Sequence, residues 1–125
     1  MYKRQTKDNT GMTLTLALSY GGKQEIFKAV KEISEKVKNE IINLDNFDDS
    51  IINDHLYTKN LPDVDLLIRT SGEQRISNFL LWQIAYAELY FTETYWPDFS
   101  EEDFTDAIIE YQKRERRFGK TSKQL

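Results

Sequence analysis

The sequence predicts an α/β protein with a mainly parallel β-sheet flanked by helices. Short apolar runs typical of strands alternate with longer stretches of helical periodicity, which is the pattern of such a sheet. No stretch rich in proline, glycine or serine divides the chain, so we predict one domain over residues 1–125. Three predicted strands are few for this architecture.

The first half of the chain is predicted to hold one strand and two helices. Residues 12–19 are rich in leucine and threonine and precede a glycine turn, which indicates a strand. Residues 23–42 carry isoleucine and valine at spacings of three and four, which predicts an amphipathic helix. A short helix follows at residues 48–56, with Asp48 or Asp49 near its cap.

The second half is predicted to hold two strands and two helices. An apolar run predicts a strand at residues 65–69, and a segment that is apolar nearly all round predicts a buried helix at residues 78–88. A short strand follows around residues 89–92. The last helix spans residues 100–118 with Ser100 as its N-cap, and its acidic start and basic end complement the helix dipole.

A polar loop with two arginines follows the predicted strand at residues 65–69. Arg69 and Arg75 are six residues apart, with Gly72 between them to let the backbone turn. Two converging guanidinium groups hold an anion well, and ligands of open α/β sheets lie at the carboxyl ends of strands. Ser77 adds a hydroxyl and is a candidate N-cap for the next helix, whose first N–H groups would also face a phosphate.

Two interpretations of this loop stay open from the residues alone. In the first, the arginines and Ser77 bind a phosphate or diphosphate. In the second, Arg69 and Arg75 pair with Glu73 and other acids in a solvated network.

Glu88 is the other polar feature of this region. From residue 79 to residue 91 only Gln83 and Glu88 are strongly polar. A carboxylate on a buried helix needs a partner or becomes neutral, and either an arginine or Mg²⁺ would serve. One carboxylate is not a metal site, so further ligands would have to come from elsewhere. The alternative, which local reasoning slightly favours, is that Glu88 lies near the helix end and reaches water or an arginine.

Composition narrows the function classes. The net charge of −4 argues against general nucleic-acid binding, and the absence of cysteine excludes disulfides and thiolate chemistry. The sequence has no signal peptide and no apolar run long enough to span a bilayer. His55 has no metal-ligand set near it in the sequence, and Trp82 and Trp96 are interpreted as packing or interface anchors.

Several long motifs carry a resemblance to a known family. They are Arg69–Gln83, Tyr86–Phe91, Trp96–Phe99 and Arg114–Gly119, with Asn9–Leu14 and Ser19–Gly22 also fitting. Together they resemble the C-terminal half of bacterial undecaprenyl diphosphate synthase, a cis-prenyltransferase also called isoprenyl transferase, and so imply its fold. Family members condense isopentenyl diphosphate onto an allylic diphosphate, usually farnesyl diphosphate, with cis stereochemistry. The product, undecaprenyl diphosphate, is the lipid carrier of cell-wall assembly.

The resemblance implies a substrate site in this chain. Its residues would grip the diphosphate of isopentenyl diphosphate: Arg69, Arg75, Ile76, Ser77, Arg117 and Gly119. The last two match an Arg-x-Gly motif that in the family completes the site across a homodimer interface. Gln74 stands where some relatives carry histidine, which leaves its role open. Holding the second substrate close and correctly oriented is a task that two arginines can perform.

The resemblance also implies a cofactor and a location. Glu88 resembles a ligand of Mg²⁺, which assists departure of the allylic diphosphate because it stabilises the negative charge that develops there. The absence of cysteine is compatible with a cytoplasmic protein, and a lipid product implies peripheral contact with the membrane. Met12, Leu14 and Leu16 could line the family's tunnel for the growing chain, although for each of them a plain core position is the stronger interpretation.

The family's catalytic aspartate belongs to a Met-Asp-Gly-Asn-Gly-Arg-Trp-like motif that does not occur in this sequence. We therefore expect no catalytic residue here, only the isopentenyl-diphosphate half-site, and no activity of the chain alone. Residues 1–5 fit the family poorly, which leaves open that they are not native. The alternatives are a non-catalytic partner subunit that donates the Arg-x-Gly motif, and a generic phosphate-binding module. Retention of the candidate site residues favours a truncated enzyme.

The resemblance also implies that the family's other strands belong to the half that this sequence lacks. We therefore expect an incomplete sheet with an exposed edge, exposed apolar helix faces and a tendency to self-associate.

Overall fold

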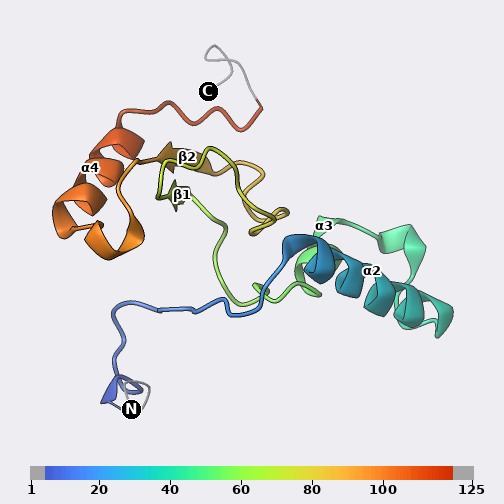
Figure 1. Cartoon of the computed structure of the whole chain (residues 1–125). Coiled ribbons are helices and arrows are strands. Elements are labelled where there is room, and N and C mark those ends of the chain that lie inside the picture. The colour runs from blue at the N-terminus through green and yellow to red at the C-terminus, as the bar shows by residue number, and fades with distance from the viewer. Residues whose placement is uncertain (1–4, 120–125) are drawn as a thin grey trace.

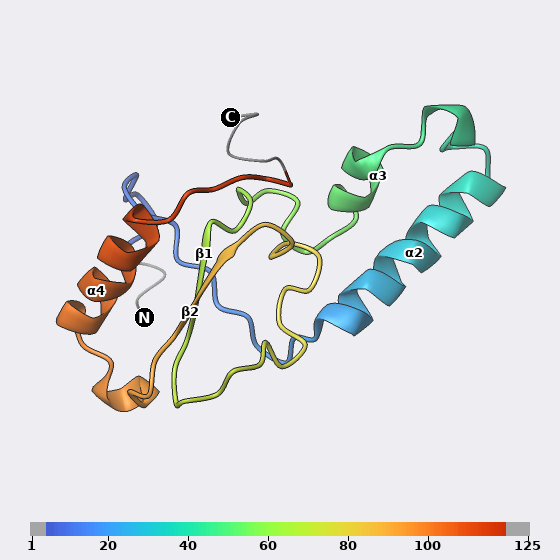
Figure 2. The same ribbon diagram turned by 90° about the horizontal axis from the view of Figure 1, so that it is seen from above.

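The computed structural model describes residues 5–119. Its elements in chain order are α2 (Gly22–Lys38), η1 (Leu44–Asn46), α3 (Asp49–Asn53), β1 (Leu66–Arg69), β2 (Glu88–Phe91), η2 (Trp96–Asp98) and α4 (Glu101–Gln112). Figure 1 shows the sheet and α4 at one end of the molecule and α2 with α3 at the other. The same division is seen from above in Figure 2.

The strands β1 and β2 pair in parallel, as the sequence predicts. Leu66 is opposite Glu88, and Arg69 is opposite Phe91. Pairing continues beyond the carboxyl ends, where the Gly72 N–H donates to the Thr92 carbonyl at 2.9 Å. Gly72 has a φ of 67°, a left-handed conformation that favours glycine, so this residue turns the chain as expected.

Helix α2 is shorter at its C-terminus than the predicted helix at residues 23–42. It ends at Lys38, and Glu40 has a left-handed φ of 58°. The N–H of Glu40 donates to the Val37 carbonyl, and the N–H of Ile41 donates to the Lys36 carbonyl. This is a Schellman closure, which satisfies the last carbonyls and stops the helix. On its inner face α2 buries Ala29 and Ile33 and packs on α3.

Two of the three predicted N-caps are confirmed. Asp48 is the N-cap of α3, where its side chain accepts from the Ser50 N–H at 2.9 Å. Ser100 is the N-cap of α4 and forms a capping box with Asp103. Hydrogen bonds from the Ser50 side chain and N–H lower the pKa of Asp48, and those from Ser100 lower the pKa of Asp103.

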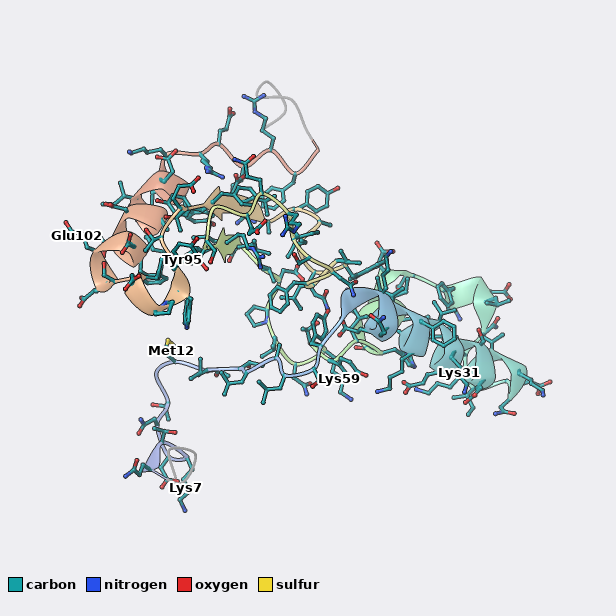
Figure 3. All side chains as sticks on the ribbon, in the orientation of Figure 1. Lys7, Met12, Lys31, Lys59, Tyr95 and Glu102 are labelled. Atoms are coloured by element: carbon teal, nitrogen blue, oxygen red, sulfur yellow. The ribbon has the colours of Figure 1, made fainter. Side chains whose placement is uncertain are left out.

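The predicted strand at residues 12–19 is wrong. These residues belong to an irregular segment, the N-terminal arm (residues 9–19), which runs from the start of α2 below the sheet in Figure 1 without joining it. Its apolar side chains are exposed, with Met12 at 84% and Leu18 at 82%. Figure 3 labels Met12 on this arm. A strand needs a neighbouring strand to satisfy its N–H and C=O groups, and no such neighbour pairs with the arm within residues 5–119.

The predicted buried helix at residues 78–88 is also wrong. The segment folds as successive turns, and Glu88 begins β2 instead of ending a helix. Ser77, Asn78 and Leu80 have positive φ angles of 49°, 62° and 46°, which a right-handed helix excludes. Ser77 is therefore not the expected N-cap.

Asn78 supplies the tertiary reason for these turns. Its carbonyl accepts from the Gly22 N–H at 2.7 Å, and its side chain accepts from the Lys23 N–H at 2.8 Å. Asn78 thus caps the start of α2, a helix far away in the sequence. Because that cap needs a left-handed turn at Asn78, it competes with a local helix.

Helix α4 ends at Gln112, six residues before the predicted end at 118. Ala107 is fully buried, and α4 packs on β2. The following residues leave the helix and cross the sheet as a C-terminal tail (residues 113–119), which is seen in both ribbon views. Long-range ion pairs of Arg114 and Arg116 replace the last turns of the expected helix.

Much apolar surface stays exposed. The accessible surface is 10583 Å², whereas a compact chain of 14.8 kDa would expose about 7,000 Å². Phe27 on α2 is 72% exposed and Phe104 on α4 is 50% exposed, which confirms the expected apolar helix faces. Among residues 5–119, every helix is too short or too polar to cross a membrane.

Candidate functional site

A cavity of about 390 Å³ lies along β1 and the segment that follows it. Arg69 and Thr70, at the carboxyl end of β1, line the cavity together with Ile76. Its other walls are apolar, and they include Leu67 and Phe79. The carboxyl end of a strand in an α/β sheet is the usual place for a ligand, so the position agrees with the sequence prediction.

Arg69, which lines this cavity, has an unpaired side-chain donor. Its Nε atom is buried and has no hydrogen-bond partner within the described part of the chain. A buried guanidinium N–H without an acceptor is costly, and an anion would satisfy it. Arg69 is therefore the residue of the predicted clamp with the clearest capacity for an anionic ligand.

Arg75 and Ser77 have a different environment. The Arg75 side chain is 68% exposed and forms an ion pair with Glu73. Ser77 is exposed, and neither residue is among those that line the cavity. The structure thus brings Arg69 and Ile76 to one cavity. Arg75 instead pairs with Glu73, as the second interpretation of the loop predicted.

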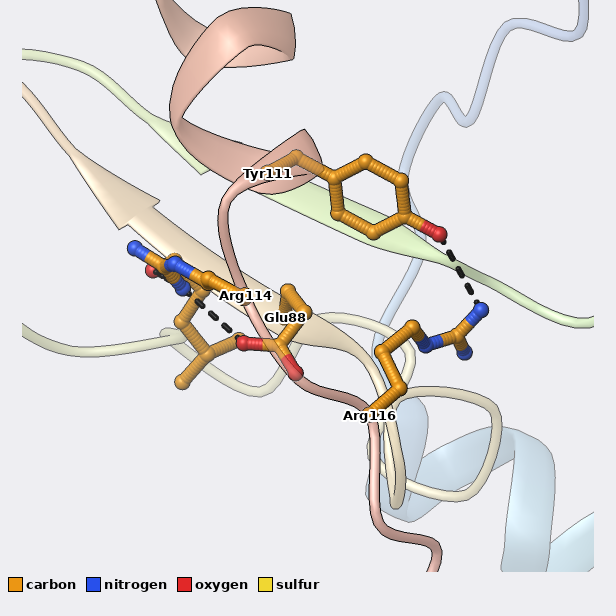
Figure 4. Close-up of polar contacts among 5 residues, drawn as sticks. Glu88, Tyr111, Arg114 and Arg116 are labelled. Carbon is orange, nitrogen blue, oxygen red and sulfur yellow. Dashed lines mark hydrogen bonds and ion pairs between the residues drawn. The ribbon is translucent and has the colours of Figure 1, made fainter. Parts of the chain in front are cut away.

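Glu88 has an arginine partner. Its Oε2 accepts from Arg114 Nη1 at 3.0 Å, and the same Nη1 donates to the Leu89 carbonyl at 2.9 Å. Figure 4 shows this contact beside the Arg116–Tyr111 hydrogen bond. An arginine was one of the two partners that the sequence left open for Glu88, the other being Mg²⁺. The pairing uses Oε2, and no described hydrogen bond uses Oε1.

Glu88 can nevertheless supply only a single carboxylate ligand. Residues 5–119 contain no group of three histidine, cysteine, aspartate or glutamate side chains that could hold a metal ion. The donor set fits Mg²⁺ only where other oxygens, such as those of a diphosphate, complete the coordination.

Arg117 and Gly119 lie in the C-terminal tail. Arg117 donates to Glu115 Oε2 from Nε at 3.0 Å and from Nη2 at 2.8 Å, and its side chain is 55% exposed. Gly119 has a φ of 77°, which favours glycine at this position. Neither residue lines the Arg69 cavity.

Sequence reasoning missed a buried carboxylate, Glu25, which is 1% exposed. It accepts from the Tyr20 hydroxyl at 2.5 Å, the Tyr57 N–H at 2.7 Å and Gln83 Nε2 at 3.0 Å. Burial raises the pKa of Tyr20 above its usual range, and the neighbouring Glu25 carboxylate raises it further.

A signal for this site was present in the sequence. Glu25 precedes Ala29 and Ile33 by four and eight residues, which puts it on the buried stripe of α2. Through Gln83 it joins the helix to the segment that follows the arginine loop.

These features define a class of protein: an α/β fold with a parallel sheet and an arginine-lined cavity at the carboxyl end of a strand. Comparison with known proteins then shows the family. Residues 1–119 match the family described as "Putative undecaprenyl diphosphate synthase". The chain belongs to this family, as the motifs of the sequence indicate.

Curated relatives agree with this assignment. An isoprenyl transferase of Clostridium perfringens is 55% identical over 115 residues, which cover 92% of this chain and 46% of the relative. A (2E,6E)-farnesyl-diphosphate-specific ditrans,polycis-undecaprenyl-diphosphate synthase of Haemophilus influenzae is 58% identical over 116 residues, covering 93% and 48%. The chain spans about half the length of the curated relatives it matches.

Solved structures confirm the fold. Lavandulyl diphosphate synthase from Lavandula x intermedia, in complex with dimethylallyl diphosphate, matches with a TM-score of 0.86 and 42% identity over 94% of this chain and 51% of that one. A probable undecaprenyl diphosphate synthase from Campylobacter jejuni matches with a TM-score of 0.73 and 37% identity over 94% and 52%.

Proposed function

We propose that this chain carries the isopentenyl-diphosphate half-site of a cis-prenyltransferase. The whole enzyme condenses isopentenyl diphosphate onto an allylic diphosphate, farnesyl diphosphate, with cis stereochemistry and makes undecaprenyl diphosphate. The names of the relatives support this reaction. The observation that carries the proposal is the buried, unpaired Nε of Arg69 at a cavity beside the strand end.

Four residues of this chain bind or surround the diphosphate, each in a different way. Arg69 donates to a diphosphate oxygen from within the cavity, and Ile76 lines the wall beside it. The exposed Arg75 side chain has one described ion pair, with Glu73. On substrate binding, Arg75 leaves Glu73 and binds the diphosphate, which carries more negative charge. Ser77, two residues further, adds its hydroxyl. Together they hold the substrate close and correctly oriented.

The tail residues Arg117 and Gly119 serve a diphosphate on a second copy of the enzyme. Arg116 of the tail binds Asp65, just before β1, whereas Arg69 ends that strand. At about 3.3 Å per residue, roughly 13 Å of strand separates Asp65 from Arg69. This separation supports a homodimer in which the Arg117 of one copy completes the site of the other.

Glu88 would hold Mg²⁺ through Oε1, with diphosphate oxygens among the remaining ligands. Mg²⁺ bound there would neutralise negative charge on a diphosphate leaving group. Arg114 holds the other Glu88 oxygen in place, so the carboxylate stays oriented. We place the enzyme in the cytoplasm, with peripheral membrane contact to release a lipid product.

The test is the affinity of the chain for isopentenyl diphosphate, measured by calorimetry. Loss of a charged hydrogen bond in Arg69→Gln removes about 1.5–3 kcal/mol, a weakening of roughly tenfold to more than a hundredfold. Arg75→Ala weakens binding within the same range. Lys31→Gln on α2 (labelled in Figure 3) is the charge-matched control and leaves the affinity unchanged. Equal affinities of Arg69→Gln and the parent chain would contradict the proposal.

A second assay concerns activity. The chain alone, given farnesyl and isopentenyl diphosphates with Mg²⁺, is expected to form no elongated product, because the sequence lacks the family's aspartate motif. Chain elongation in this assay overturns that expectation.

The alternative function is a non-catalytic partner subunit that donates the Arg-x-Gly motif. The exposed position of Arg117 favours this alternative as much as it favours the half-site of an enzyme. The coding sequence upstream of Met1 separates the two, since an in-frame Asp-Gly-Asn-Gly-Arg motif belongs to the enzyme.

A further inference from the structure

The C-terminal tail is held on the sheet by two arginines. Arg114 Nη1 donates to Glu88 Oε2 at 3.0 Å and to the Leu89 carbonyl at 2.9 Å. Glu88 and Leu89 are the first two residues of β2. The Arg114 side chain is 30% exposed, so the pair is partly shielded from water. This contact fixes the start of the tail against the amino-terminal end of β2.

Arg116 holds the tail at the neighbouring strand. Its Nη1 donates to Asp65 Oδ1 at 2.5 Å and to the Tyr111 hydroxyl at 3.0 Å. Asp65 directly precedes β1, and its carbonyl accepts from the Glu88 N–H at 2.9 Å. Because β1 and β2 are parallel, both arginines bind at the same end of the sheet.

Aromatic contacts continue the attachment. The Arg116 guanidinium carbon lies 4.6 Å from the centre of the Phe118 ring. Phe118 in turn lies against Tyr86, with ring centres 6.0 Å apart. Arg116 therefore connects the end of α4, the start of β1 and the last part of the tail. Figure 4 shows Tyr111, Arg116 and Arg114 around this crossing.

Arg117 lies on the opposite side of the tail. Its side chain is 55% exposed, against 25% for Arg116, and its described contact is with Glu115 of the same segment. Successive side chains of an extended chain point to opposite faces. Attachment through Arg114 and Arg116 therefore directs Glu115 and Arg117 away from the sheet.

We propose that Arg114 and Arg116 are positioning residues that latch the tail across the amino-terminal ends of β1 and β2 and thereby orient Arg117 and Gly119 outward. The latch is a property of the tail itself. Its consequence for diphosphate binding rests on the proposed function. A tail that is already ordered binds without the cost of ordering it at the moment of contact.

The first test measures attachment of the tail without any ligand. The sequence contains no cysteine, so Glu115→Cys accepts a single nitroxide label for electron paramagnetic resonance. Arg116→Gln is expected to sharpen the spectrum, as the label becomes mobile. Lys113→Gln removes the same charge from the same segment but breaks only an exposed pair with Glu110, so the spectrum stays broad. A broad spectrum in Arg116→Gln overturns the latch.

A charge reversal separates the ion pair from general unfolding. Asp65→Arg alone and Arg116→Asp alone are both expected to release the label, whereas the double variant restores the broad spectrum. Far-ultraviolet circular dichroism of each variant checks that the helices remain. Release in the double variant as well, with helices intact, would contradict an Asp65–Arg116 latch.

The second test measures affinity for isopentenyl diphosphate in the same variants. If Arg116→Gln leaves the tail correctly placed one third of the time, the apparent dissociation constant rises about threefold. Arg116→Lys, which keeps the charge, recovers part of this loss. A mobile tail with unchanged affinity keeps the latch and overturns its role in binding. Absence of any binding in the parent chain overturns the proposed function and leaves the latch to the spectroscopic test.

Discussion

The N-terminal arm and strand β1 have similar apolar sequences but reach opposite environments. Leu16 in the arm is 71% exposed, whereas Leu67 in β1 is 8% exposed. The difference lies in the neighbours: β1 has β2 beside it and turns packed over it, and the arm has no paired strand in the described structure. Apolar side chains on an extended segment therefore do not make a strand until another segment satisfies the backbone.

The comparison extends to charge. Residues 9–19 contain no ionisable side chain, whereas the sheet and the C-terminal tail are joined by the ion pairs of Arg114 and Arg116. The arm can therefore gain stability from apolar contacts and from backbone pairing, but not from ion pairs. The sheet has both buried apolar side chains and ion pairs to the C-terminal tail.

The largest expected effect concerns self-association through the arm. Leu14→Lys with Leu16→Lys removes two leucines from any buried contact, which costs roughly 3–6 kcal/mol. The association constant should fall more than a hundredfold, as measured by sedimentation velocity over a range of concentrations. Thr13→Lys with Thr15→Lys places equal charge on the alternate positions and should have a smaller effect. A parent chain that is monomeric and melts cooperatively would contradict the expectation.

Next in size is a matched pair of leucine truncations. Leu67→Ala removes a buried side chain beside β2 and should lower the free energy of unfolding by about 2–5 kcal/mol. Leu16→Ala, in the exposed arm, should change it by less than about 0.5 kcal/mol. Urea denaturation followed by circular dichroism measures both. Equal losses would show that the arm is packed in solution.

A smaller effect is expected at Tyr20, where the arm meets the folded part. Tyr20→Phe removes the hydroxyl that donates to the buried Glu25 carboxylate. Loss of a hydrogen bond to a charged group should cost about 1.5–3 kcal/mol, measured by urea denaturation. Tyr95→Phe, whose exposed ring makes no described hydrogen bond, is the control. No difference between the two variants would remove Glu25 from the stabilising contacts.

The smallest effect is the acid dependence of α4. Hydrogen bonds from Ser100 lower the pKa of Asp103. A carboxyl whose folded pKa is depressed stabilises the fold above its unfolded pKa, near 3.9, and this stability disappears as the pH falls through the lower folded value. Helicity of α4 should therefore decrease below about pH 4, and Asp103→Asn should remove part of that dependence. An identical acid profile in the variant would contradict the role of this cap.

The N-caps and the cavity beside Arg69 show which features could be predicted from the sequence. Asp48 and Ser100 were predictable because an N-cap binds N–H groups two or three residues away. The place of Arg69 followed from the position of a strand end. The helix predicted at residues 78–88 failed because Asn78 caps α2, a contact that spans 55 residues between Lys23 and Asn78. Helical periodicity is read from a short stretch of sequence, which does not include a partner so far away.

The family, the parallel sheet and the caps at Asp48 and Ser100 were determined by the sequence alone. These properties depend on motifs and on neighbours within a few positions. Only the tertiary structure decided that Glu88 pairs with Arg114, that Arg75 pairs with Glu73 away from the Arg69 cavity, and that the arm remains unpaired. A charged or extended segment takes whichever partner the folded chain brings within about 4 Å, and that choice is made by the packing of distant elements.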